Sequence, residues 1–245
     1  NGTLLGSVRN MHRIWEFPVK SLLRDCGNEL KVVLYSPTRF IREAYGERPM
    51  EGSSDAMQGF PYLRKAHCMF GWDWGAHLPD AGIFRPVYLC YVKNASLEDV
   101  YIRQRQEKND WLLDFQIQWK EEQKGDYQIQ VSAVSPQGEV FETWLSPKGM
   151  GILRISDPQL WWVNGLGDQP LYQVRAVLYR NGEVEDCWER RIGLRKMTVR
   201  REKDQWGESF APMVNGVNYF AMGGDYIPEE HLLGRIRSRK RRRLL

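Results

Sequence analysis

The 245-residue sequence lacks the side-chain pattern of a metal centre. It contains only four Cys and four His. No two Cys are spaced as C-x-x-C, and no His stands at zinc-ligand spacing from them. We therefore expect neither a metal nor another cofactor. Thiols without a pairing pattern are typical of a reducing compartment, which predicts a cytoplasmic protein.

Long apolar runs and a basic surplus are also missing. No apolar stretch reaches the roughly 18 residues of a membrane span. The formal net charge of +4 comes from one end: seven of the 35 basic residues lie in 235–245, and the remaining 28 face 31 acidic residues. The body therefore lacks the electrostatic footprint of a nucleic-acid-binding protein. We interpret the basic end as the exposed end of an amphipathic helix, with a nucleic-acid or membrane patch as the alternative.

An initiator Met and a secretory leader are absent from the start of the sequence. The chain opens on Asn-Gly-Thr-Leu-Leu-Gly, which is typical of the middle of a hairpin. We therefore expect the sequence to be a piece of a longer protein.

Tryptophan, by contrast, is abundant, and one stretch gathers it around a carboxylate. The chain has ten Trp, and in Phe70–Gly75 the side chain of Asp73 stands between Trp72 and Trp74. A buried carboxylate needs polar partners, so this is a poor sequence for a core. Flat aromatic faces beside one strong acceptor suit a sugar. The alternative is a Trp-rich strand end in which Asp73 caps a turn.

Residues 1–93 read as an incomplete β-sandwich. The runs 30–35 and 83–93 have the composition of strands. Between them, Ser36 is expected to cap a helix with Pro37 at its first position. The apolar stripe of that helix comprises Phe40, Ile41, Ala44 and Tyr45. Strands with one short helix and long loops predict a sandwich seen without its first strands.

Residues 94–193 read as a second sandwich, separate from the first. Seven short strands with period-two patterning are expected at 99–103, 111–119, 127–134, 140–145, 151–155, 171–179 and 184–192. Asn181-Gly182 is a strong hairpin signal between two of them. This pattern predicts an immunoglobulin-like sandwich. The double Trp at 161–162 is interpreted as a plug between domains, with a ligand platform as the alternative.

Residues 194–245 begin a different kind of domain. The run 199–210 resembles a hairpin. Residues 213–228 read as a turn and a buried strand with a polar end, and 229–245 read as a helix. A strand followed by a helix, with polar residues at the strand's C-terminal end, predicts the start of a βα unit.

Together these pieces resemble a β-mannosidase of glycoside hydrolase family 2, over essentially the whole chain. The matching pieces are Asn1-Gly2, Asn10-Met11, 27–30, 70–75, 82–87, 160–162, 164–165, Gly167, 169–172, 191–193 and 215–228. The resemblance implies a mainly β chain in three parts. These are a partial galactose-binding-like jelly roll over 1–93, an immunoglobulin-like sandwich over 94–193, and the first βα unit of a truncated (β/α)₈ barrel over 194–245.

The resemblance also implies an activity, the retaining hydrolysis of terminal non-reducing β-D-mannose in oligosaccharides. Such chemistry uses two carboxylates about 5 Å apart. In the family both are Glu on later barrel strands, so we assign no catalytic residue to this chain and expect the fragment to be inactive. Glu229 and Glu230 would lie in the first turn of a helix, where acids interact favourably with the dipole.

Two substrate-binding positions carry over from the family. Trp72, Asp73 and Trp74 would contact the mannose, with Asp73 accepting hydrogen bonds from its hydroxyls. Asp225 and Tyr226 would lie at the end of the first barrel strand, where the family pattern has Asn-Trp. The change from Asn to Asp adds a charge and the change from Trp to Tyr shrinks the platform, and both bear on the sugar specificity.

Two kinds of alternative remain open. One is a stand-alone carbohydrate-binding or scaffold protein made of two sandwiches. The other is a different family 2 activity: β-galactosidase, β-glucuronidase or exo-glucosaminidase. The expected partner is a β-mannoside oligosaccharide, with no nucleic acid and no membrane, and a homodimer stays open.

Overall fold

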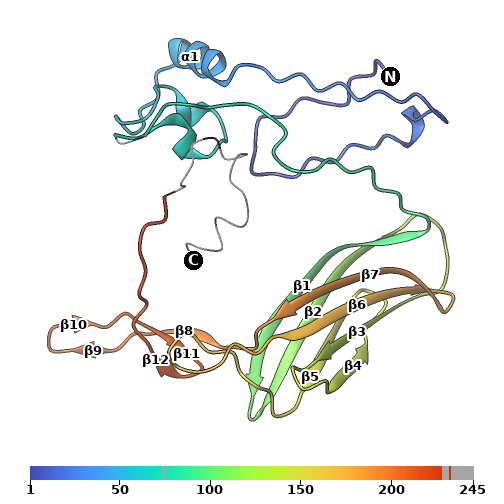
Figure 1. The fold of residues 1–245 in the computed structure, drawn as a ribbon. Coiled ribbons are helices and arrows are strands. Elements are labelled where there is room, and N and C mark those ends of the chain that lie inside the picture. Colours follow the sequence, from blue (N-terminus) through green and yellow to red (C-terminus); the bar gives the residue numbers. More distant parts are fainter. Residues whose placement is uncertain (74, 228–231, 233–245) are drawn as a thin grey trace. The chain divides into compact units, whose positions relative to one another are not determined.

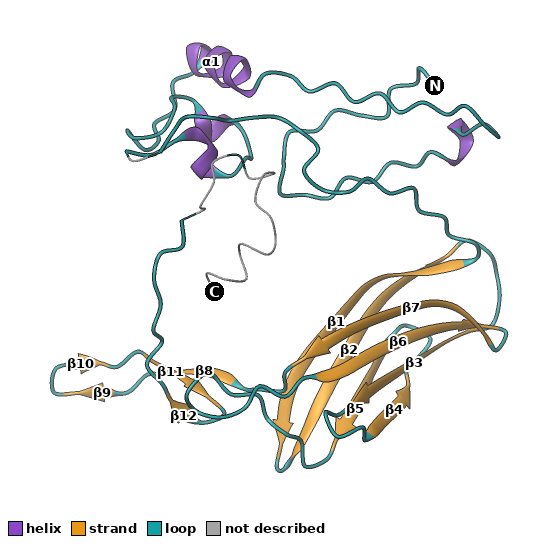
Figure 2. Ribbon diagram, viewed as in Figure 1, coloured by secondary structure: helices purple, strands orange, loops and turns teal. Residues whose placement is uncertain are grey.

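The computed structural model describes residues 1–73, 75–227 and 232, and the chain divides into two compact units (Figure 1). The first unit consists of Asn1–Tyr88 with Gly224–Leu245, and the second is Leu89–Gly223. Among the described residues, the helices lie in the first unit and the strands in the second (Figure 2).

The second unit contains two antiparallel sheets that face each other as a sandwich. One sheet has the order β1-β2-β5 and the other the order β4-β3-β6-β7. The strands are β1 (Ala95–Glu107), β2 (Asp110–Glu121), β3 (Tyr127–Val134), β4 (Val140–Trp144), β5 (Met150–Ile155), β6 (Tyr172–Arg180) and β7 (Glu183–Ile192). Each of the seven expected strands forms, which confirms the sandwich predicted for this part of the chain.

Alternation along the strands places one shared core between the sheets. In β2, Phe115 and Ile117 are buried, while Gln116 and Gln118 are exposed, as the period-two pattern predicts. The facing sheet contributes Val131, Val174 and Leu178, among others, to the same buried cluster. The apolar face of each sheet is therefore covered by the other.

The hairpin between β6 and β7 forms at the predicted turn. Asn181 has φ 51° and Gly182 has φ 83°, so both central residues are left-handed. Arg180 and Glu183 pair across the turn. Two left-handed residues define the type I′ geometry that Asn-Gly favours, because it matches the twist of the strands.

A polar contact joins the two sheets at the start of β1. The side chain of Asn94 is only 6% exposed. Its Nδ2 donates to Oε2 of Glu185 at 2.8 Å, and its backbone N–H donates to Oε1 of the same carboxylate at 3.0 Å. Because the ionised carboxylate accepts both bonds, the pKa of Glu185 is lowered, mainly by the Asn94 side chain.

Beyond the sandwich, the second unit continues into a smaller sheet and a hairpin. The sheet has the order β12-β11-β8, and β9 pairs with β10. The strands are β8 (Met197–Arg200), β9 (Lys203–Asp204), β10 (Gly207–Glu208), β11 (Ala211–Val214) and β12 (Val217–Asn218). The hairpin expected within 199–210 is therefore present.

The buried strand expected within 213–228 is not formed beyond β12. Residues 219–227 have no regular structure, and Phe220 and Met222 are exposed. A barrel strand is stabilised by neighbouring strands on both sides, and the described residues provide none here. The helix expected over 229–245, with Glu229 and Glu230, lies outside the described residues apart from Leu232.

The first unit is organised around one helix, α1 (Pro37–Glu47), and three short 3₁₀ turns, η1 (Lys20–Leu22), η2 (Phe60–Tyr62) and η3 (His67–Phe70). The hydroxyl of Ser36 accepts a hydrogen bond from the N–H of Arg39, and Pro37 is the first helical residue, as predicted. Ile41 from this helix packs with Ala56 and Phe70 in a small buried cluster.

The strands expected at 30–35 and 83–93 are not formed, and this prediction was wrong. Both segments lack strand structure. Their apolar side chains are exposed, including Leu30 at 62% and Tyr88 at 77%. A strand needs a neighbour for its backbone hydrogen bonds, and the described residues pair none with these segments. Residues 1–93 therefore show no jelly-roll strands in this structure.

Truncating a core side chain in β5 should destabilise the sandwich strongly. Leu153 is 2% exposed and Ile152, its neighbour on the opposite face, is 49% exposed. We expect Leu153→Ala to cost about 2–5 kcal/mol, because it leaves a cavity between the sheets. Ile152→Ala, the matched control, should cost less than about 1 kcal/mol. Urea unfolding followed by circular dichroism measures both, and equal losses would contradict the assignment of faces.

The Glu185 contact predicts a pH-dependent contribution to stability. Because the folded pKa of Glu185 is lowered, its stabilisation is present above the unfolded pKa and is lost as pH falls through the folded pKa. In Glu185→Gln the amide can accept only one of the two bonds from Asn94. We expect this variant to melt below the parent at neutral pH and to converge with it under acidic conditions.

The control for this experiment is Glu183→Gln, an exposed carboxylate in the same strand. Melting temperatures of the three proteins from pH 7 to pH 3 provide the measurement. A difference between the parent and Glu185→Gln that stays constant across this range would contradict the prediction.

Candidate functional site

The Trp72–Asp73 turn follows directly from the buried cluster of the first unit. Phe70, the last residue of η3, is fully buried. Gly71 then takes φ +94°, and a Cβ at this position would lie 1.8 Å from Cδ2 of His77. Both the left-handed backbone and this close approach require glycine. The buried Phe and the glycine thus place the next two side chains at the surface.

The turn itself is short and presents both side chains to solvent. The N–H of Gly75 donates to the carbonyl of Trp72 at 3.1 Å, which closes the turn. Trp72 is 40% exposed and Asp73 is exposed. Within the described residues, no hydrogen bond to the Asp73 carboxylate supports a capping role for it. Trp74, the third predicted contact residue, lies outside the described residues.

An aromatic chain connects the exposed indole of Trp72 to the buried cluster. The His67 ring stacks on Phe60 with centroids 4.3 Å apart and an interplanar angle of 19°. The same imidazole meets Trp72 edge-on, at 6.0 Å and 76°. Phe60 in turn lies 5.9 Å from buried Phe70. Sequence reasoning missed His67, since only the folded chain brings these rings together.

Burial shifts the pKa values of two side chains that lie shortly before the turn in the sequence. Burial lowers the pKa of half-buried Lys65, and attraction to Asp80 partly opposes that shift. Burial also raises the pKa of the Cys68 thiol, which keeps it protonated and a poor nucleophile. The arrangement therefore offers recognition, through an acceptor and a flat face.

The second predicted binding position lies on a different segment of the chain. Asp225 and Tyr226 are on backbone without regular structure, and Tyr226 is 58% exposed. The barrel strand that was expected to carry them is not formed. Trp72 and Asp73 are thus the predicted site residues that the structure brings together on one turn.

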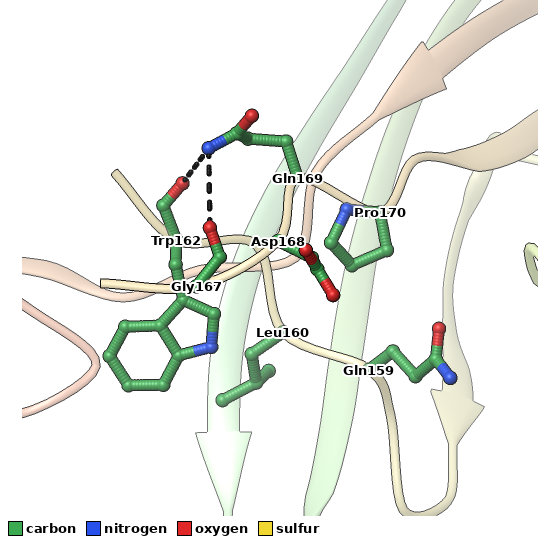
Figure 3. Close-up of a pocket in the computed structure, with 7 residues that line it drawn as sticks. All are labelled: Gln159, Leu160, Trp162, Gly167, Asp168, Gln169 and Pro170. Atoms are coloured by element: carbon green, nitrogen blue, oxygen red, sulfur yellow. Dashed lines mark hydrogen bonds between the residues drawn. The ribbon is translucent and has the colours of Figure 1, made fainter. Parts of the chain in front are cut away.

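A separate hollow of about 670 Å³ lies in the loop between β5 and β6 of the second unit (Figure 3). Trp162, Asp168 and Gln169 are among the residues that line it. Nε2 of Gln169 donates to the Trp162 carbonyl and to Oδ1 of Asn164, both at 3.1 Å. The N–H of Trp162 donates to the Asp168 carbonyl at 2.9 Å. These bonds fold the loop onto itself.

Trp161, next to the hollow, is a packing residue. A Cβ at Gly193 would lie 2.7 Å from its ring, and the Arg195 guanidinium lies 4.8 Å from its centroid. Its N–H donates to the Leu194 carbonyl, and its own carbonyl accepts from Nδ2 of Asn215 at 3.0 Å. Trp161 thereby fastens the turn between β11 and β12 to the end of the sandwich.

Two kinds of feature are absent from the described part of the chain. There, no group of three or more His, Cys, Asp or Glu side chains could hold a metal ion. In the same residues, no helix is both long and apolar enough to cross a bilayer.

Two protein families match consecutive parts of the sequence. A family described as "Glycosyl hydrolase 2 galactose-binding domain-like" matches residues 1–85. A second, described as "Glycosyl hydrolases family 2", matches residues 95–195, which contain the sandwich. Together they match a part of each unit, and the first match includes the Trp72–Asp73 turn.

Curated relatives match almost the whole chain. Beta-mannosidase B of Thermothelomyces thermophilus is 29% identical over 98% of this chain and 29% of its own length. Beta-mannosidase A of Aspergillus clavatus is 27% identical over 98% of this chain and 30% of its own length. The chain therefore spans less than a third of each of these relatives.

A solved structure agrees in fold as well as in sequence. The crystal structure of the β-D-mannosidase from Dictyoglomus thermophilum is 32% identical, with a TM-score of 0.85, over 99% of this chain and 31% of that one. The similarity extends through the Trp72–Asp73 turn. Both families match in order, and these relatives match 98–99% of this chain, so this chain belongs to glycoside hydrolase family 2.

Proposed function

We propose that this chain is the non-catalytic part of a retaining hydrolase that removes terminal, non-reducing β-D-mannose from oligosaccharides. One observation carries the proposal: the relatives that match 98–99% of the chain are β-mannosidases. In this proposal residues 1–93 belong to the sugar-binding jelly roll, 94–193 form the immunoglobulin-like domain, and 194–245 begin the catalytic barrel.

Both catalytic carboxylates would then lie outside this chain. Retaining hydrolysis needs an acid/base and a nucleophile about 5 Å apart. The exposed acids Asp73 and Asp225 have a different role in this proposal, as acceptors for sugar hydroxyls, with Trp72, Trp74 and Tyr226 as flat faces beside them. The 245-residue chain alone should therefore be inactive.

The direct test compares this chain with the complete product of its gene. We expect the reading frame to continue past Leu245 into a barrel, and the complete protein to hydrolyse p-nitrophenyl β-D-mannoside. The corresponding β-galactoside and β-glucuronide serve as controls. A stop codon after Leu245, with measurable mannobiose binding by the chain, would instead support a carbohydrate-binding protein. A faster β-galactoside reaction would assign another activity of the family.

The proposed contact between Asp73 and the sugar predicts a large role for this residue in the complete enzyme. Asp73→Ala removes a carboxylate that would accept hydrogen bonds from the sugar. We expect kcat/KM to fall about 30- to 1,000-fold, which corresponds to a loss of about 2–4 kcal/mol of transition-state stabilisation. Because Asp73 is exposed, the melting temperature should not change.

Asp55→Ala is the matched control, since Asp55 is also an exposed acid in a turn of the first unit. Its kcat/KM should stay within about twofold of the parent. A loss below threefold for Asp73→Ala would remove Asp73 from the site.

A further inference from the structure

We infer that His67 is a positioning residue for the Trp72 indole, which the proposed function uses as a sugar platform. The inference rests on that proposed function and adds to it a residue outside the Trp-Asp-Trp motif. It starts from a property of the turn: Trp72 is partly exposed, and backbone bonds alone do not hold an indole in one rotamer.

The ring contacts provide a path from the buried cluster to this exposed side chain. Phe70 is fully buried, Phe60 packs against it, and the His67 imidazole stacks nearly parallel on Phe60. Stacking on Phe60 favours one orientation of the imidazole, although His67 is itself exposed, and the contact with Trp72 then restricts the indole from one side. Edge-to-face and stacked geometries are those in which aromatic rings attract each other.

This arrangement leaves the indole both held and accessible. His67 meets Trp72 at 76°, so the imidazole does not lie flat on the indole, and Trp72 keeps 40% of its surface exposed. A platform that is already oriented loses less rotamer entropy when the sugar binds. His67 thus acts through Trp72, without contacting the sugar itself.

The first test observes the indole directly in the 245-residue chain. The chain is labelled with 5-fluorotryptophan, and the ¹⁹F resonance of Trp72 is assigned by its loss in Trp72→Phe. We expect His67→Ala to shift this resonance, and His67→Phe, which keeps a flat ring on Phe60, to restore it towards the parent position. His12→Ala, an exposed histidine of the same unit, should leave it in place. An unmoved resonance in His67→Ala would overturn the inference.

The second test uses the complete enzyme. We expect His67→Ala to raise KM about three- to tenfold while kcat stays within twofold, because a contact made equally in the ground and transition states is weakened. His67→Phe should recover most of the loss. In the Trp72→Ala background, His67→Ala should have no further effect, because its target is gone.

The outcomes separate this inference from the proposed function. If Trp72→Ala leaves KM and kcat unchanged, the proposed platform fails, whatever His67 does to the resonance. If Trp72→Ala raises KM but His67→Ala does not, the platform stands and the positioning role is wrong. If the effect of His67→Ala persists in the Trp72→Ala background with a lowered melting temperature, His67 serves only stability, and the inference is likewise overturned.

Discussion

Hydrogen bonding between neighbouring strands is the constraint that decides which segments of this chain form regular structure. Each strand of the sandwich has a hydrogen-bonded neighbour, and β2, β3 and β6 are paired on both sides. The paired sheets then bury a common cluster that includes Leu113, Val131 and Leu178. Where the described residues offer no neighbour, as at 30–35, an apolar run forms no strand and its side chains stay exposed. In these segments, apolar side chains are therefore buried where the strands are paired and exposed where no pairing forms.

This dependence explains which parts of the fold were predictable. The alternation of Phe115 and Ile117 with Gln116 and Gln118 is a local pattern, and the hairpin at Asn181-Gly182 follows from the backbone preference of two residues. Both predictions were confirmed. The runs 30–35 and 83–93 have the composition of strands, but composition says nothing about which strands would be their neighbours. The partner is a long-range property, and here the prediction was wrong.

In the candidate site too, some residues could be predicted from the sequence and others depend on contacts made in the folded chain. Residue types suggested either a sugar site or a capped turn at Trp72 and Asp73, and the resemblance to the family favoured the sugar site. The supporting residues were not predictable in this way. His67 is defined by its stacking on Phe60, and the need for glycine at Gly71 by the ring of His77, six residues further on. These contacts arise only after the loop has folded around buried Phe70.

Trp72 and Trp161 both lie in tryptophan-rich segments, but their surroundings in the structure differ. Both place an aromatic ring beside polar residues. Trp161 has Gly193 against its ring and Arg195 beside it, and its backbone N–H and C=O are both bonded, so its surface is used for packing. Trp72 has an edge contact to His67 and keeps 40% of its surface exposed. The contacts of Trp161 therefore support packing, and the exposure of Trp72 is compatible with the platform role that we propose for it.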